Sequence, residues 1–370
     1  MFKSSSKLQE SKGKKKGNIW QLFRATNFES LMYPCFTICR ILGMFSYKIN
    51  ALNIKICKIC YVLSIIIASV ISVCTLIALY VLNFSKEVEY TNVPITKKLH
   101  DNWLLVSGGF MQVVTFILNK PRMHLIQTIL ELSLRLPLET YQNLSRLIHT
   151  KDIFGLVYIF VEASIIFCNL PENFLSKIFV LYNILFSFQM DMLYMNCVFV
   201  LKACFKQIND NLINLEAPVT NDESYSFRSI YYNGRNSLML MELKALKKQH
   251  LAVSDTVQVL NKIFSVQLIA NMILTMTRSS LKMGLLIWTC ETGKNQAAAI
   301  NTTVHSVLNS TSDKEIKHEL QLFSLQLMHH KNVFSAKWFN MDVALLTAMM
   351  RGITTHLVIL IQFLYISCNE

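Results

Sequence analysis

Polar side chains interrupt the last strongly apolar segment of the chain, and their spacing permits two kinds of chemistry. The segment TTHLVILIQF ends at Phe363. On a helix, Thr355 and Gln362 lie seven residues apart and share a face, with Ile359 close to it. One amide among apolar residues suits a pore constriction, where apolar side chains gate by dewetting and amides help an ion through. The same polar groups could instead hydrogen-bond to a neighbouring helix.

Two acidic residues lie in other apolar segments, Glu162 and Asp191. A bare charge in lipid is costly, so an acid at such a position is treated first as a functional candidate. Either carboxylate could contact a ligand or a buried base. An internal salt bridge or hydrogen bond is the competing interpretation.

The remaining reactive residue types form no recognisable catalytic or metal site. Cys57 and Cys60 make a CxxC motif, but no second pair follows at zinc-ribbon spacing. His329 and His330 have no further ligand cluster beside them, so we expect packing at both places. The sequence has no nucleotide-binding loop, nucleophile elbow or HExxH motif. We therefore expect no enzyme activity, no metal and no cofactor.

The composition points to a membrane protein. The 370 residues are 52% hydrophobic and 16% charged, whereas soluble domains carry about 25% charge. Glycine and proline are scarce, which favours a helical bundle over a β-barrel of short alternating segments. The net charge of +13 fits basic cytoplasmic loops better than nucleic-acid binding. The expected fold class is an all-α, multi-span transmembrane bundle.

Six segments are apolar and long enough, at about 20 residues, to be transmembrane candidates. They cover residues 59–82, 102–119, 153–171, 178–201, 263–289 and 343–368. A shorter apolar segment, 31–47, is interrupted by Pro34, Arg40 and Gly43 and is expected to form a short helix that lies on the inner face or dips into it. Lysine and arginine gather in the second and fourth connections, which places those connections and the N-terminus inside.

These features divide the chain into six parts. We expect a cytoplasmic tail over 1–30, an N-terminal helix with spans one to four over 31–204, and cytoplasmic anchor helices with a loop over 205–262. A fused fifth and sixth span covers 263–290, a cytoplasmic linker and helix covers 291–342, and the last, pore-type span covers 343–370.

The ending resembles that of insect gustatory receptors. Members of that family end in a Thr-Tyr pair, five mostly apolar residues, and then Gln-Phe. Here Thr355-His356 precedes LVILI and then Gln362-Phe363, with histidine in the place of tyrosine. The segments MYPCFTICRILGMFSY, LKALKKQHLAVSDTVQVLNKIFSVQLIA and ELQLFSLQLMHHKNVFSAKWFNMDVALLTAMM are also similar to the family, so the resemblance covers most of the chain.

The resemblance implies a seven-span receptor with a cytoplasmic N-terminus in the plasma membrane of a sensory neuron. It implies a ligand-gated, non-selective cation channel of four subunits, alone or with other gustatory receptors. The last span of each subunit would line the pore, with Gln362 and Phe363 at the gate. An outer pocket would bind a small-molecule tastant, and membrane lipid would surround the spans.

Residues 263–289 depart from the family pattern, which has two spans and an outer loop in this region. As one helix these 27 residues would extend about 40 Å, enough for one crossing and too short for two. Part of both spans is therefore expected to be missing. Six crossings would leave the C-terminus inside, unless the fused segment fails to cross fully and the last helix keeps the family's direction.

Two other functions remain open. The chain could be a non-conducting or truncated subunit that modulates other chemoreceptors. It could also be a membrane transporter, although that class favours an internal inverted repeat with broken helices, and none is visible.

Overall fold

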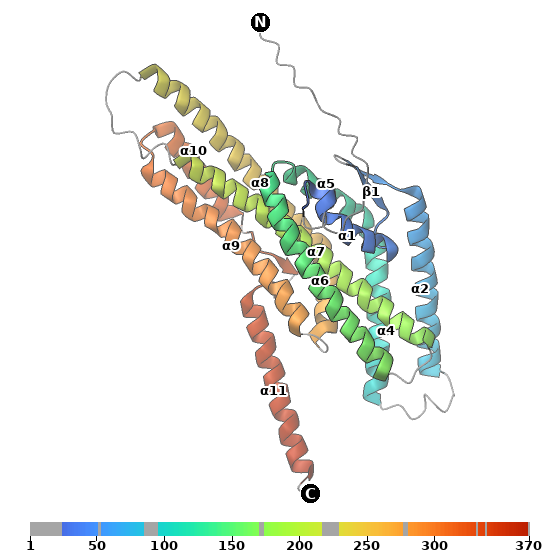
Figure 1. Cartoon of the computed structure of the whole chain (residues 1–370). Helices are drawn as coiled ribbons and strands as arrows, with labels where there is room; N and C mark the ends of the chain where they lie inside the picture. The colour runs from blue at the N-terminus through green and yellow to red at the C-terminus, as the bar shows by residue number, and fades with distance from the viewer. Residues whose placement is uncertain are drawn as a thin grey trace.

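The computed structural model describes residues 24–50, 53–84, 95–169, 174–216, 229–276, 280–330, 332–336 and 339–368. Long helices and two short hairpins make up this part of the chain (Figure 1). The prediction of an all-α, multi-span bundle is confirmed. The helices are α1 (Phe28–Ile41), α2 (Lys58–Phe84), α4 (Ile95–Ile117), α5 (Asn119–Ser133), α6 (Leu138–Asn169), α7 (Phe174–Glu216), α8 (Ser229–Met276), α9 (Ser280–Ser310), α10 (Lys314–His329) and α11 (Val343–Cys368), and the strands are β1 (Tyr47–Asn50), β2 (Asn53–Ile56), β3 (Ser335–Ala336) and β4 (Phe339–Asn340).

Local sequence signals fix both ends of α1. Asn27 and Ser30 form a reciprocal capping box at its start, which satisfies two backbone N–H groups that the helix leaves free. The helix ends before Gly43, whose φ of +73° is a left-handed conformation that glycine adopts without the steric cost of a side chain. The chain then turns into the β1–β2 hairpin. The expected helix over 31–47 therefore starts three residues earlier and ends sooner.

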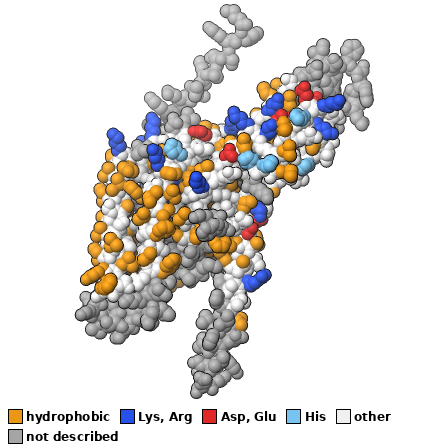
Figure 2. All heavy atoms as spheres, turned by 180° about the vertical axis from the view of Figure 1, so that it is seen from behind, with side chains coloured by type: hydrophobic (Ala, Val, Ile, Leu, Met, Phe, Trp, Pro, Cys, Tyr) orange, Lys and Arg blue, Asp and Glu red, His pale blue; other side chains and the backbone are white. Residues whose placement is uncertain are grey.

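Two described helices are long and apolar enough to cross a membrane, by length and composition. One is the segment Lys58–Val81, in which only 11% of an 18-residue apolar stretch is buried within the chain, and the other is Lys177–Leu215, in which 83% of such a stretch is buried. The first therefore faces outward, and the second is central. Figure 2 shows hydrophobic side chains gathered over one broad surface, with most Lys and Arg beyond its upper edge. This distribution agrees with an apolar membrane zone and a basic inner side.

Helix α8 runs antiparallel to the central helix α7. Asn271 of α8 donates a hydrogen bond to Asp191 of α7, while the ring of His250, further back on α8, lies 5.8 Å from that of Phe205. As the residue number falls along α8, the partner's number on α7 rises. The two helices therefore run in opposite directions.

Helix α9 runs parallel to α7. Cys290 of α9 contacts Tyr194, and Thr303, further on, contacts Asn209. Both numbers rise together, so α9 follows α7 and returns in the direction opposite to α8. Helices α8 and α9 thus form an antiparallel pair against α7.

The single fused helix expected over residues 263–289 is not what the structure shows. Helix α8 ends at Met276 and α9 begins at Ser280 with the opposite direction. From residue 263 to its end, α8 extends only about 20 Å, less than the ~30 Å hydrocarbon core. An apolar run has the same composition whether the chain continues or reverses within it, so composition could not reveal the reversal.

Several expected boundaries fall inside continuous helices. Helix α7 runs unbroken through residue 204 to Glu216, and α8 runs unbroken through residues 262 and 263. Helix α9 continues to Ser310 where a linker was expected. The helices are long, as predicted extensions would be, but the cytoplasmic position of those extensions stays a prediction. The expected tail up to residue 23 and most of the loop after α7 lie outside the described residues.

The start of α11 is tied to the middle of α8. The Asn261 side chain donates to the Val333 carbonyl at 2.7 Å and accepts from the Ser335 amide at 3.2 Å. The β3–β4 pair follows at once, and Asp342 then accepts the Leu345 amide in the first turn of α11. The last helix projects away from the bundle from this point (Figure 1).

Candidate functional site

Helix α11 carries the residues that the sequence singled out for a pore. Thr355 is exposed, and its hydroxyl donates to the Arg351 carbonyl one turn back at 2.9 Å. Val358 is 46% exposed, and a Cβ on Gly352 would have no atom within 4 Å. A long apolar helix with an exposed hydroxyl and exposed aliphatic side chains has a surface that one copy of the chain leaves uncovered.

For the other predicted gate residues, the structure gives the position of the backbone. Ile359, Gln362 and Phe363 all lie within the helical range of α11. Their side chains lie outside what the structure describes. The helical backbone keeps Thr355 and Gln362 two turns apart on one face, as the spacing predicted.

A buried polar cluster lies where α8 crosses α4, α5 and α7. We call it the α8 polar cluster, and it consists of Thr115, Arg122, Ser187, Asp191, Gln267 and Asn271. On its α7 side, Asp191 is 3% exposed and accepts a hydrogen bond from Asn271 at 2.8 Å. The Ser187 hydroxyl donates to the Asn271 side-chain oxygen, so the amide bonds both residues of α7.

On the other side of the cluster, Gln267 holds a fully buried arginine. Arg122 is 0% exposed, and its Nη2 donates to the Gln267 oxygen at 2.9 Å. The Gln267 amide nitrogen donates to the Thr115 hydroxyl at 2.6 Å. The guanidinium also lies over the Phe264 ring, 5.3 Å from its centre, which attracts the cation.

The two halves of the cluster meet on one face of α8. Gln267 and Asn271 are four residues apart, so they are neighbours on adjacent turns. One amide contacts the cation and the other contacts the anion. A shift of α8 along its axis would therefore strain contacts to α4, α5 and α7 together. Asp191 thus has the internal hydrogen bond that we weighed against ligand binding.

The structure keeps the two predicted acids in different surroundings. Glu162 is on α6 and only half-buried, whereas Asp191 is in the cluster. The residues that sequence reasoning missed are Arg122, counted there as a basic loop residue, and the two amides of α8. The sequence feature that could have indicated this cluster is the pair of amides, four residues apart, in the apolar segment KIFSVQLIANM.

Two cavities lie near these elements, and both are small. One, of about 20 Å³, is lined by polar side chains that include Ser64, Gln112 and Asn119, and it has room for about one water molecule. The other, of about 260 Å³, lies between α9 and α10 and includes Lys294 and His330. Sites for drug-sized ligands usually measure about 300–1,000 Å³. Neither cavity identifies a tastant pocket.

Helices α7, α8 and α10 pack around a buried histidine. The ring of His250 lies between those of Phe205 and Phe323, and its Nδ1 accepts from Gln326 at 3.2 Å. The Gln326 nitrogen also donates to the Lys247 carbonyl, which fixes the orientation of the amide. Burial lowers the pKa of His250 to about 4, so the ring is uncharged near pH 7.

Known proteins share sequence with this chain. The chain matches the family described as 7tm Chemosensory receptor over residues 32–281 and 280–366. It is 48% identical to putative gustatory receptor 28b of Drosophila melanogaster over 68 residues, 18% of this chain and 14% of that protein. It is 31% identical to gustatory receptor 23a of the same species over 87 residues, 23% of each chain. The matched segments thus cover less than a quarter of either relative.

The fold is that of a solved insect receptor. The insect olfactory receptor OR5 from Machilis hrabei superposes with a TM-score of 0.65 at 11% identity, covering 90% of this chain and 97% of that one. The structure of that receptor in complex with eugenol gives a TM-score of 0.57 at 10% identity, over 91% and 98% of the two chains. At this identity the likeness establishes the fold alone.

Proposed function

The chain belongs to the insect gustatory receptor family of 7tm chemosensory receptors, and we propose that it is a subunit of a ligand-gated, non-selective cation channel. It is a membrane-embedded, multi-pass receptor, and we place it in the plasma membrane of a sensory neuron. Its ligand is a small-molecule tastant, in line with the eugenol complex of the structural relative. Four subunits, alone or with other gustatory receptors, surround one pore.

The observation that carries this proposal is the direction and exposure of α11. Residue numbers increase together on α8 and on α10 with the segment after it: Lys247 contacts Glu319, and further on Asn261 contacts Ser335. This part of the chain therefore runs parallel to α8. If the N-terminus is inside, α7 runs inward and α8 outward, and α11 leaves Asn261 in the outward direction. This is the direction that the family's last span takes, and the exposed face of α11 is available to other copies.

Thr355, Ile359, Gln362 and Phe363 line the pore in this proposal. The apolar side chains close the path by dewetting, and the Gln362 amide offers an oxygen to a partly dehydrated cation. The α8 polar cluster contributes at a distance, because it holds α8 and therefore the start of α11. Asp191 has this positioning role, whereas Glu162 remains the candidate for ligand contact.

A second candidate function is a non-conducting subunit that modulates other chemoreceptors. The end of α8 favours it, since the helix extends only about 20 Å from residue 263 to Met276, less than the hydrocarbon core, before α9 runs in the opposite direction. Such a subunit would give no current alone and would alter the current of a co-expressed receptor.

Whole-cell recording separates the two candidates. Cells expressing the chain alone are compared with cells expressing a Gln362→Ala variant, at matched surface expression. A channel subunit gives a current that reverses near 0 mV with mixed cations, and the variant changes its amplitude or relative cation permeability. Current that is absent alone, but changed in a partner receptor on co-expression, would assign the modulatory function instead.

A further inference from the structure

The β1–β2 hairpin places two lysines directly opposite each other. In its antiparallel register, Lys48 pairs with Lys55, and both side chains are exposed. Residues paired across two strands lie on the same face of the sheet. Two ammonium groups therefore share one small surface.

Like charges at directly opposed positions destabilise a hairpin. Among the described residues, neither lysine has an ion pair or hydrogen bond through its side chain. Glu131 on α5 reaches the hairpin only indirectly, because it accepts from Gln127, whose own oxygen accepts the Ile54 amide. The repulsion is thus not relieved by an acid within the described chain.

The surrounding contacts hold this pair in a fixed place. The Arg40 Nε donates to the Tyr47 carbonyl at 3.0 Å, and the Tyr47 hydroxyl donates to Asn119. The Cys57 amide donates to the Ser46 carbonyl at the base of the hairpin. Lys48 and Lys55 are therefore presented by a tethered hairpin rather than by a free loop.

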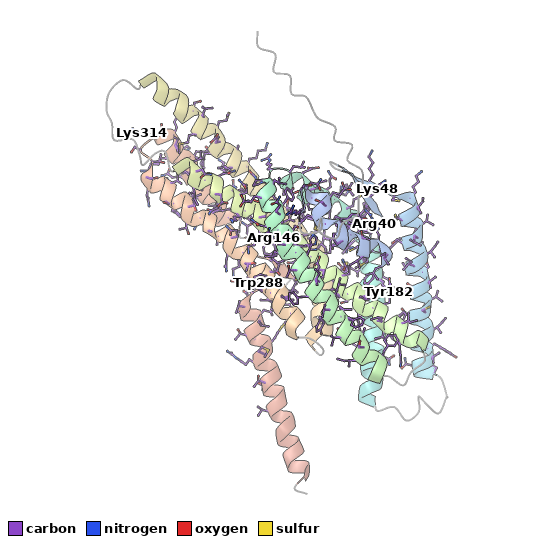
Figure 3. All side chains as sticks on the ribbon, in the orientation of Figure 1. Arg40, Lys48, Arg146, Tyr182, Trp288 and Lys314 are labelled. Atoms are coloured by element: carbon purple, nitrogen blue, oxygen red, sulfur yellow. The ribbon has the colours of Figure 1, made fainter. Side chains whose placement is uncertain are left out.

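The hairpin lies next to α2, a long apolar helix that is largely exposed. Lys58, three residues after Lys55, begins α2, and the next residue, Ile59, is 82% exposed. Figure 3 shows Lys48 and Arg40 near the end of α2 at which the apolar surface of Figure 2 meets the basic region. Under the positive-inside rule, that end lies at the inner leaflet, which carries the anionic lipids.

We propose that Lys48, Lys55 and Lys58 bind the phosphorylated headgroup of an anionic phospholipid in the inner leaflet. The ammonium groups donate hydrogen bonds to phosphate oxygens, and the acyl chains lie along the exposed apolar face of α2. This site is separate from the proposed pore and does not depend on conduction.

The test uses the full chain, purified in detergent micelles with a C-terminal tag. A fluorescent short-chain phosphatidylinositol 4,5-bisphosphate is titrated, and its anisotropy is measured. Each lysine near a membrane surface contributes about a fivefold gain in affinity for anionic lipid, so replacing all three by glutamine should weaken binding on the order of 100-fold. The matched control replaces Lys314 and Lys317 by glutamine, since both are exposed lysines in the first turn of α10, and Figure 3 shows Lys314 far from Lys48. This control should retain the parent affinity.

A single charge reversal separates binding from a structural role. Lys55→Glu turns the repulsive pair into an attractive one, so the lipid-free protein should melt at the same temperature as the parent or higher. Lipid binding should nevertheless fall more than tenfold. If the triple variant binds like the parent, if the α10 control loses as much, or if phosphatidylcholine binds equally well, the proposed site is wrong.

Discussion

At the residue scale, the buried arginine of the α8 polar cluster depends on one amide. Of its guanidinium nitrogens, Nη2 bonds to Gln267, whereas Nε and Nη1 have no partner among the described residues. A hydrogen bond to a buried charged group contributes more than one between neutral groups. Loss of Gln267 would therefore leave a buried cation without a hydrogen-bond acceptor among the described residues.

Replacing Gln267 by leucine should lower the stability of the receptor by about 2–3 kcal/mol, because the buried cation loses its hydrogen-bond acceptor. The double variant Arg122→Met with Gln267→Leu should recover much of that loss, since an apolar pair of similar volume needs no partner. Thermal melting in detergent, followed by fluorescence-detected size exclusion, measures both. Equal melting temperatures for the parent and the Gln267→Leu variant would contradict the assigned contact.

His250 makes the stability of the packing between α7, α8 and α10 depend on pH. Its folded pKa of about 4 lies below the ordinary 6.5, so between these values the unfolded chain binds more protons. Stability is fully present above about pH 6.5 and falls as the pH is lowered toward 4, by at most about 3 kcal/mol. The variant His250→Phe should melt with a weaker dependence over that window. Gln326 keeps its hydrogen bond to the Lys247 carbonyl in this variant, so its amide retains a partner. If stability depended on pH as steeply in the variant as in the parent, another titratable group would be responsible.

At the scale of elements, glycine marks where α9 packs closely. A Cβ on Gly293 would lie 2.7 Å from the Phe334 ring and 3.2 Å from Val198 of α7. Gly284, on the same helix, would meet no atom within 4 Å. The two positions therefore differ in packing but share one secondary structure.

Gly293→Ala should destabilise the protein by about 1–3 kcal/mol, because the buried Phe334 ring must shift. Gly284→Ala should be neutral or stabilising by up to about 1 kcal/mol, because alanine favours the helix. Thermal melting of both variants beside the parent is the measurement. The same cost at both positions would mean that close contact is not what separates them.

The sequence predicted most elements because their signals are local. Apolar runs located the membrane helices, and the Pro34-to-Gly43 segment located α1. The reversal between α8 and α9 was missed, since it depends on which helices the two arms pack against. Partners such as Arg122 with Gln267 are 145 residues apart in sequence and depend on the same packing. The shared helical face of Thr355 and Gln362 could be predicted because both residues lie within one helix, α11.

At the scale of the whole molecule, the proposed topology, with the N-terminus inside, has α11 running outward. A tag after residue 370 should therefore be accessible to antibody in intact cells, whereas a tag at residue 1 should require permeabilisation. Both tags in one chain control for expression and leakiness. A C-terminal tag detected only after permeabilisation would mean that α11 runs inward, and the pore assignment would fail.

The length of α8 has a mechanical consequence. Asn271 of α8 bonds to α7, and from this residue back to Ser229 the helix extends roughly 60 Å. Asn261, which holds the start of α11, lies only about 15 Å from Asn271. If α8 is treated as a rigid rod that pivots at Asn271, a tilt of about 5° moves Asn261, and with it the start of α11, by roughly 1 Å. The same tilt moves the far end of α8, at Ser229, by roughly 5 Å. A motion too small to observe at Asn261 is thus about four times larger at Ser229. A pair of distance probes there would sense movement of α8 most sensitively.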